Sequence, residues 1–374
     1  MAFYDVKEGV AIIPDSETRI ERLAFADCTD LKSVTIPGSV TEIGSAAFKG
    51  CTSLTSIIIP DSVTGIGRDV FRGCTGLASI VVAEGNKSFD SRDNCNAIIA
   101  TESNWLGMGC QNTVIPDSVT MIVEYAFHDC TSLTSINIPD SVTKIGESAF
   151  KGCTGLTSIT IPGSVTEIGS AAFQGCSGLK SVTIGNSVTE ISAYAFEGCT
   201  GLTSVTTGDS VTKIGRNAFD GCTGLKSVTI PDSVTEIGIW AFKGCTGLTS
   251  VTIGKNVEEI SDNAFEGCTG LTSITILGSA TVIGEDAFKG CTALTSINIP
   301  TGVKKIDYGA FSECPLETVT LGTGINKISS YAFNYNHIKV INVPAKKADY
   351  YMKRLPEELH DKIVELPPEK KAKK

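Results

Sequence analysis

Residues 156–178, with the sequence LTSITIPGSVTEIGSAAFQGCSG, form the clearest copy of a 23-residue unit that fills most of the chain. Further copies begin at Leu133, Leu179, Leu202, Leu225, Leu248, Leu271 and Leu294. A fixed period of this length is typical of solenoids, in which one turn of chain cannot bury its apolar side without neighbours. The sequence therefore predicts a stack of equivalent turns.

Each copy predicts two short extended pieces and one helical turn. In the copy quoted above, Ile159 and Ile161 alternate with hydroxyl residues, which indicates a strand with one buried face. Pro162 ends this strand, because proline cannot donate a ladder hydrogen bond. A second extended piece surrounds Ile168, and the apolar spacing that ends at Cys176 indicates a single α or 3₁₀ turn. The predicted fold is a β-rich solenoid, with a parallel sheet on one side and short extended pieces plus single helical turns on the other.

Stacking would place equivalent side chains over one another as columns in the core. The phenylalanine column comprises Phe25, Phe48, Phe71, Phe127, Phe150, Phe173, Phe196, Phe219, Phe242, Phe265, Phe288, Phe311 and Phe333. Its largest irregularity separates Phe71 from Phe127. We expect Thr207 and Ala280 to be weak core positions, because most other copies carry larger aliphatic side chains there.

The two ends of the chain depart from the repeat. Residues 1–24 are predicted to form an N-terminal cap, residues 25–343 the solenoid, and residues 344–374 a helical cap with a basic tail. Terminal repeats need a polar outer face, which explains the departures. The helical cap is expected over residues 348–361, and the residues from Leu366 onward are expected to be a flexible tail.

An irregular elongated repeat, residues 83–113, breaks the period and is called the insert below. Within it, residues 97–100 and 105–108 are expected to pair as a hairpin across a short polar turn. The hairpin contains Trp105 and Met108, which are candidate binding residues. Two interpretations stay open: an elongated turn that packs its apolar residues onto the core, or a projecting edge that contacts a partner.

Fourteen cysteines are present, and twelve of them follow a phenylalanine of the column by three residues. Parallel side chains in a column point the same way, which disfavours disulfides between neighbours, so we predict buried, inert thiols. Cys95 and Cys110, both in the insert, are able to pair in an oxidising compartment. The sequence has no Cys-x-x-Cys pair and predicts no metal site. Many reduced thiols favour a reducing compartment.

Charge argues against a nucleic-acid partner, and hydropathy argues against a membrane-spanning segment. The formal net charge is −10, and an acidic solenoid is a poor nucleic-acid binder because phosphate contacts need clustered Lys and Arg. No apolar run is long enough to predict a transmembrane segment. The N-terminus lacks the basic and apolar regions of a signal peptide, so a cytoplasmic location is expected unless a leader has been removed.

The search for catalytic motifs predicts that the chain is not an enzyme and uses no cofactor. Its three histidines are far apart in sequence, and no triad, P-loop or dinucleotide motif is present. His128 follows Phe127 at a position where other copies carry charged or amide residues, so it is predicted to be a surface residue. In the second extended piece, the residue before the isoleucine is charged in several copies, as at Glu42, Lys144 and Glu167. Because both signs occur, this row predicts a mixed-charge solvated face.

The exposed side of the main sheet, called the strand face below, is the other predicted binding surface. Its central row contains Thr160, Thr183, Thr206, Thr229, Thr252 and Thr275. Ile58 and Val81 make its N-terminal part apolar, next to the insert. Either the hydroxyl residues simply suit a solvated sheet, or they recognise an extended protein or glycan partner.

The repeated pattern Leu-x-x-Ile-x-Ile-Pro-x-x-Val-x-x-Ile-Gly-x-x-Ala-Phe-x-x-Cys resembles the BspA-like leucine-rich repeats over residues 12–343. The segment DSRDNCNAII, residues 90–99, is similar to an irregular repeat of bacterial members. The resemblance implies a solenoid that binds proteins, often at the cell surface after export, and that in some members adheres to host matrix proteins. It brings no catalytic motif.

Together these observations favour a non-enzymatic protein–protein interaction scaffold that uses the strand face, the insert or both. The alternative is a cell-surface adhesion or carbohydrate-binding module.

Overall fold

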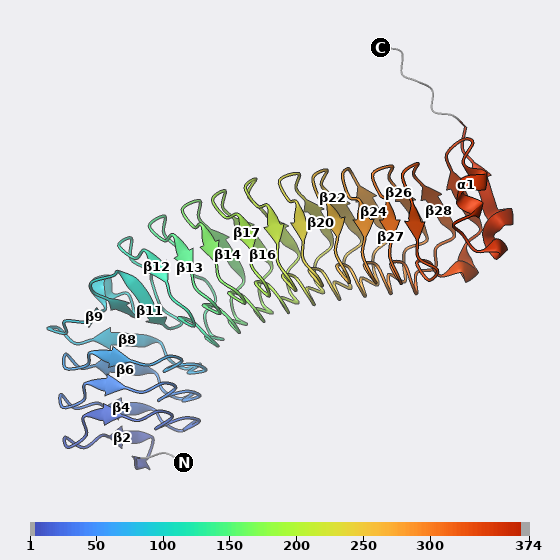
Figure 1. Cartoon of the computed structure of the whole chain (residues 1–374). Coiled ribbons are helices and arrows are strands. Elements are labelled where there is room, and N and C mark those ends of the chain that lie inside the picture. The colour runs from blue at the N-terminus through green and yellow to red at the C-terminus, as the bar shows by residue number, and fades with distance from the viewer. Residues whose placement is uncertain (1–3, 368–374) are drawn as a thin grey trace. The chain divides into compact units, whose positions relative to one another are not determined.

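A computed structural model of the chain describes residues 4–367. The chain divides into two units, the first running to Val188 and including Gly198–Gly208, the second comprising Thr189–Glu197 and the residues from Asp209 onward. Within each unit the chain winds as a β-solenoid, with a longer strand on one side of most regular turns and a two-residue strand on the other (Figure 1). The copy that begins at Leu133 lacks the longer strand. The predicted solenoid fold is confirmed.

The longer strands carry the alternating apolar residues of the repeat. In the first unit they are β2 (Val10–Ile12), β4 (Ser33–Thr35), β6 (Ser56–Ile59), β8 (Ser79–Val82), β14 (Ser158–Ile161), β16 (Ser181–Ile184) and β18 (Ser204–Thr206). In the second unit they are β20 (Ser227–Ile230), β22 (Ser250–Ile253), β24 (Ser273–Ile276), β26 (Ser296–Ile299), β28 (Thr318–Leu321) and β30 (Val340–Val343). Neighbours pair parallel with equivalent residues opposite each other, as in Ile161 with Ile184. They form separate sheets of two to four strands.

The two-residue strands form the other side of each unit. In the first unit they are β3 (Arg19–Ile20), β5 (Glu42–Ile43), β7 (Gly65–Ile66), β12 (Met121–Ile122), β13 (Lys144–Ile145) and β15 (Glu167–Ile168). In the second they are β17 (Glu190–Ile191), β19 (Lys213–Ile214), β21 (Glu236–Ile237), β23 (Glu259–Ile260), β25 (Val282–Ile283), β27 (Lys305–Ile306) and β29 (Lys327–Ile328). The predicted mixed-charge face is confirmed where Lys144 Nζ lies 2.8 Å from a Glu167 carboxylate oxygen.

The segment expected as a helical turn is a series of hydrogen-bonded turns. The Ala172, Gln174 and Cys176 N–H groups each donate to the carbonyl three residues earlier, which is 3₁₀ spacing. Ala171 has a φ of 55°, so the turns cannot merge into one helix. Equivalent residues in most other copies share this conformation.

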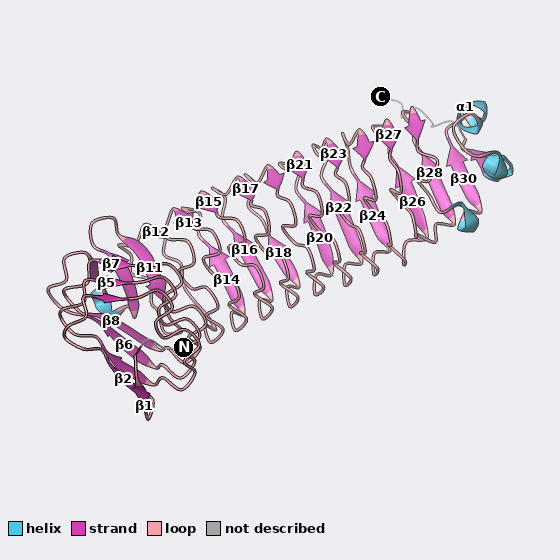
Figure 2. Ribbon diagram, turned by 60° about the horizontal axis from the view of Figure 1, so that its bottom comes forward, coloured by secondary structure: helices cyan, strands magenta, loops and turns pink. Residues whose placement is uncertain are grey.

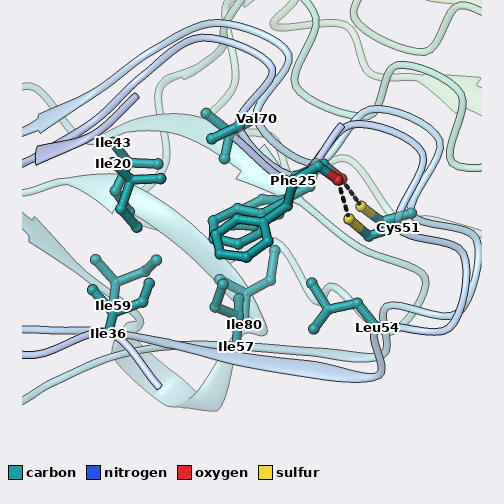
Figure 3. Close-up of a cluster of buried hydrophobic side chains, with 14 of the residues drawn as sticks. Ile20, Phe25, Ile36, Ile43, Cys51, Leu54, Ile57, Ile59, Val70 and Ile80 are labelled. Atoms are coloured by element: carbon teal, nitrogen blue, oxygen red, sulfur yellow. Dashed lines mark hydrogen bonds between the residues drawn. The ribbon is translucent and has the colours of Figure 1, made fainter. Parts of the chain in front are cut away.

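Phenylalanine rings stack along the core of each unit, as the columns predict. Phe25 and Phe48 lie 5.1 Å apart between ring centroids and are nearly parallel. Figure 3 shows this cluster, in which the Cys51 thiol donates a hydrogen bond to the Phe25 carbonyl of the preceding turn, with Sγ 3.1 Å from the oxygen. The same bond recurs at later copies, including Cys176 to Phe150. Cysteine therefore provides both apolar volume and a donor for a carbonyl that alanine would leave less satisfied.

All fourteen cysteines are free, as predicted for the column. Cys28 and Cys130 are half-buried and the other twelve are buried. Burial is the largest of the effects that raise the pKa of Cys176. The raised pKa keeps this thiol protonated. Cys95 and Cys110 bond to backbone carbonyls of the insert instead of to each other.

The two ends are closed differently. At the start, β1 (Val6–Lys7) pairs antiparallel with β2, and the Tyr4 ring stacks on Phe25. At the end, the expected helical region contains α1 (Ala348–Met352) and η3 (Glu357–Lys362), after the short η2 (Tyr335–His337) (Figure 2).

A last strand, β31 (Ile363–Glu365), was not predicted. It pairs parallel with β30, with Ile363 opposite Ile341. Its three residues follow the helical cap too closely to show an alternating pattern in the sequence. The expected basic tail lies mostly outside the described residues. Within residues 4–367, no helix has both the length and the hydrophobicity needed to cross a membrane.

Candidate functional site

The insert folds as the predicted hairpin, preceded by a short strand and a 3₁₀ turn. Its elements are β9 (Phe89–Asp90), η1 (Arg92–Asn94), β10 (Ala97–Ala100) and β11 (Trp105–Gly109). β10 pairs antiparallel with both β9 and β11, and β11 pairs parallel with β12. The insert therefore extends the sheet of two-residue strands into six strands, in the order β15-β13-β12-β11-β10-β9.

Polar side chains specific to this region hold the insert in place. The Arg92 guanidinium lies 2.6 Å from an Asp90 carboxylate oxygen and 2.7 Å from the Asn104 side-chain oxygen. Burial acts to raise the pKa of Asp90, but the hydrogen bonds and the charge of Arg92 outweigh it and lower that pKa overall. The Asn86 amide donates to the carbonyls of Pro60 and Val63, at 2.8 and 2.9 Å. These bonds replace the repeated bonds of the regular turns.

The insert acts as a wedge between two turns of the first unit. Away from the two-residue strands, the turn before the insert contacts the turn after it, because the Arg72 guanidinium lies 2.7 Å from the Asp129 carboxylate. On the side of the two-residue strands, the hairpin separates them. Gly109 packs against Phe127, and a Cβ there would lie 2.1 Å from the ring. Glycine is required because the hairpin covers the face of this ring where a regular turn would stack a phenylalanine.

His128 is not a surface residue, contrary to the prediction. Its side chain is only 5% exposed, and Nδ1 lies 2.9 Å from an Asp69 carboxylate oxygen. Burial is the largest effect on the pKa of His128 and lowers it, although Asp69 and Asp129 act in the opposite direction. The insert causes this burial, because the turn that precedes the insert covers the position of His128. In the regular copies the residue after the phenylalanine is half-exposed.

A hollow of about 590 Å³, called the insert hollow, opens between β7, the hairpin and the strands β12, β13 and β15. Its apolar lining includes Ile66, Phe89, Ile98, Trp105, Met108 and Met121. The Trp105 side chain is 47% exposed. An indole ring with this much solvent contact offers a large apolar surface to a partner. The structure thus brings together Trp105 and Met108, the two insert residues proposed from sequence.

Charged side chains rim the insert hollow, and acidic groups outnumber basic ones. Arg68 lies 2.5 Å from Glu124, which balances that pair. Lys144 similarly balances Glu167. Two further carboxylates remain: Asp69, which bonds to His128, and Glu147, whose oxygen is 3.3 Å from the Tyr125 hydroxyl. The rim therefore favours a ligand that carries positive charge.

Sequence reasoning missed the contributions of Met121 and Tyr125 to this site. Met121 stands in the row where other turns of the first unit carry Glu42, Lys144 and Glu167. A methionine in a row of charged residues was a readable signal. Tyr125 occupies the left-handed position of its turn, with a φ of 62°, and it lines the hollow.

The strand-face residues form separate ladders and do not line the insert hollow. In the first unit, Thr160, Thr183 and Thr206 are exposed and adjacent in register. In the second unit, Thr229, Thr252 and Thr275 form an equivalent row, in which Thr252 is half-buried.

Ile58 pairs with Val81, and both are exposed, so the apolar N-terminal part of the strand face is present. Two further apolar residues occupy the equivalent position of their own turns: Ile12, which is 71% exposed and pairs with Thr35, and Val114, which is 69% exposed. The signal that was missed is that each precedes an Ile-Pro pair, as Thr160 does.

No group of three or more His, Cys, Asp or Glu side chains able to hold a metal occurs in the part of the chain that the structure describes. The two surfaces instead offer apolar contact, charge and hydroxyl groups.

Comparisons with known proteins agree with this architecture. The family description "BspA type Leucine rich repeat region (6 copies)" matches residues 1–100, 106–226 and 212–339. A search of curated proteins found no match. A leucine-rich repeat protein from Bacteroides ovatus is 26% identical, with a TM-score of 0.53; the match covers 96% of this chain and 94% of that one. A leucine rich cell surface protein from Faecalibacterium prausnitzii is also 26% identical, with a TM-score of 0.37, covering 93% and 94% of the two chains.

Proposed function

The chain belongs to the family of BspA-type leucine-rich repeat proteins, and from this premise we propose that it is a non-enzymatic scaffold that binds a protein partner at the insert hollow. The repeat turns supply a rigid frame, and the insert supplies the recognition surface. Solenoids of this kind commonly use their extended faces for binding.

One observation carries this proposal: the insert hollow combines a half-exposed indole with methionine side chains. Trp105, Met108 and Met121 line the same hollow. Tryptophan is enriched among the residues that dominate binding energy at protein interfaces. Methionine adapts to partners of different shape because its side chain is unbranched and polarisable. The volume of about 590 Å³ suits one or two partner side chains.

The charge of the rim narrows the partner to a basic segment. A lysine or arginine has an apolar stem that can lie along Trp105 and Met108, while its charged end reaches Glu147 or Asp69 at the rim. The Tyr125 ring, also part of the lining, can face the same cation. The chain's formal net charge of −10 adds long-range attraction for a basic partner.

Selection from a random peptide library on the immobilised full-length protein tests the proposal. We expect the selected peptides to carry Lys or Arg next to an apolar residue. Trp105→Ala should weaken their binding at least tenfold, in the range of a hot-spot residue. Trp240→Ala, which removes the other tryptophan and lies outside both surfaces, is the matched control and should leave their affinity unchanged. Selection of acidic peptides, or equal affinity for the Trp105→Ala and unmodified proteins, would contradict the proposal.

We also propose that the strand face gives the same partner a second, extended contact. The support is the exposed apolar pair of Ile58 and Val81, which lie opposite each other in register, together with the exposed Ile12 and Val114 at the same position of their own turns. Ile58→Lys would place a strongly hydrated charge in this pair and should weaken binding of the full-length partner several-fold. Unchanged affinity would assign the contact to the insert hollow alone.

A further inference from the structure

A second hollow lies in the second unit, where the last turns meet the C-terminal segments η2 and η3. Its volume is about 450 Å³, which is within the range of small-ligand sites. Its lining contains three tyrosines, Tyr308, Tyr331 and Tyr335. The proposed protein-binding function does not use it, because the insert hollow belongs to the first unit.

Two of the tyrosines form an exposed pair, called the ring corner below. Tyr308 and Tyr331 come from adjacent turns, and they are 52% and 64% exposed. Their ring centroids lie 5.5 Å apart, with an angle of 57° between the ring planes. A cation is attracted to a ring face when it lies within about 6 Å of the centroid. One cation in the ring corner can therefore interact with both rings.

A glycine brings a carboxylate next to the ring corner. Gly309 follows Tyr308, and its N–H donates to the Tyr331 carbonyl at 3.2 Å. At the equivalent position other copies carry a side chain, as at Asn217. A Cβ on Gly309 would collide with a carboxylate oxygen of Asp286. The missing side chain thus leaves space that the Asp286 carboxylate occupies beside the two tyrosine residues.

The charged groups of this hollow leave an excess of negative charge. Its lining contains the carboxylates of Asp286, Glu313 and Glu358 but only one ammonium group, that of Lys289, which lies 3.3 Å from Asp286. Glu313 and Glu358 are exposed, and neither forms an ion pair within residues 4–367. After burial, the charge of Glu358 is the other cause that raises the pKa of Tyr335 to about 12, so this carboxylate acts on the third tyrosine of the lining.

We propose that this hollow binds a methylated ammonium group, held in the ring corner of Tyr308 and Tyr331. In such a group the positive charge is spread over methyl groups, which contact aromatic faces directly. A lysine ammonium is compact and strongly hydrated, and ring faces offer it no hydrogen-bond acceptor in exchange for the lost water. The three carboxylates add the negative field that selects a cation over a neutral ligand of the same shape.

Ligand-observed NMR titration of the full-length protein tests this inference with two probes of the same shape. Choline carries a trimethylammonium group, and in its neutral tert-butyl analogue carbon replaces the nitrogen, which removes only the charge. We expect choline to bind at least tenfold more tightly than the analogue, because rings and carboxylates both act on the charge. A peptide with one trimethyllysine identifies the source of the group. Tighter binding than choline would indicate a methylated protein segment, and equal or weaker binding a small molecule.

Variants of the ring corner assign the binding to this hollow. Tyr331→Ala should weaken choline binding at least tenfold, whereas Tyr331→Phe keeps the ring and should largely retain it. Glu358→Gln should weaken binding several-fold without changing the circular dichroism or the unfolding midpoint. Tyr194→Ala is the matched control, since it lies in the same Tyr-Ala-Phe context outside the hollow, and should leave the affinity unchanged.

Three results would overturn the inference. The first is that choline does not bind, and the second is that the neutral analogue binds as tightly as choline. The third is that choline binding survives Tyr331→Ala and is lost in Trp105→Ala, which would place it in the insert hollow. Peptide selection at the insert hollow does not depend on Tyr331, so the two proposals fail or stand separately.

Discussion

The regular turns and the insert are stabilised by different kinds of contact. In the regular turns, each core residue lies against its own equivalent, as Phe150 does against Phe173 with rings 5.1 Å apart. In the insert, order depends on side chains that occur once, such as Arg92 between Asp90 and Asn104. Because the same core contacts recur in every regular turn, these turns also present similar surfaces to solvent. The single exception in the first unit is also where its aromatic hollow lies.

The largest expected effect comes from breaking a ring stack in a regular turn. Phe150 is fully buried between Phe127 and Phe173. Phe150→Ala should lower the free energy of unfolding by roughly 3–5 kcal/mol, because it removes apolar burial and leaves a cavity. Phe89→Ala, at a half-buried position of the insert, should cost clearly less. Urea unfolding of both variants measures the difference, and equal losses would contradict the contrast drawn here.

A smaller and more local effect is expected from the insert's polar anchor. Arg92→Met keeps the length of the side chain but removes its bonds to Asp90 and Asn104, which should cost about 1.5–3 kcal/mol. Hydrogen exchange should become faster in residues 89–109 while the regular turns stay protected. Lys213→Met, which removes exposed ion pairs, is the control and should change little. Faster exchange along the whole first unit would show that the insert is not a separate element.

The rate at which each cysteine thiol is alkylated should depend on how deeply that thiol is buried. Alkylation of the native protein should begin at the half-buried Cys28, while buried thiols such as Cys176 react only after unfolding. Cys176→Ala removes the hydrogen bond to the Phe150 carbonyl and should cost about 1 kcal/mol. Mass spectrometry after timed iodoacetamide treatment measures the order. Rapid labelling at Cys176 would contradict the buried column.

The weakest predicted effect is a pH dependence at the junction of the insert with the following turn. The pKa of His128 is lowered in the folded state, so the unfolded chain binds the proton more readily. Stability at the junction should be complete above the ordinary histidine pKa of about 6.5 and decrease as the pH falls toward the lower folded-state value. Asp69, Asp129 and Arg72 face the ring and set the size of the effect. Amide protection at the junction, taken relative to the intrinsic exchange rate at each pH, should fall between pH 7 and 5, and it should fall less in His128→Gln.

Much of this architecture was readable because the copies can be aligned with one another. The strand from Ser158 to Ile161 and the hairpin follow from local patterns in the sequence, whereas the exposure of Trp105 was one of two interpretations that the sequence left open. The insert hollow did not follow, because it depends on contacts between residues far apart, such as Arg72 with Asp129. The burial of His128 has the same cause. Strand β31 was missed because three residues are too few to show a period.

The most direct test of the central claim uses the fluorescence of Trp105. Trp240→Phe leaves Trp105 as the sole tryptophan, and this ring lines the insert hollow. Titration with a short lysine–leucine peptide should give a saturable change in emission that weakens with added salt and is reduced several-fold by Glu147→Gln. The matching glutamate–leucine peptide should give none. Equal responses to both peptides, or no response to either, would contradict the claim that this hollow receives a basic partner.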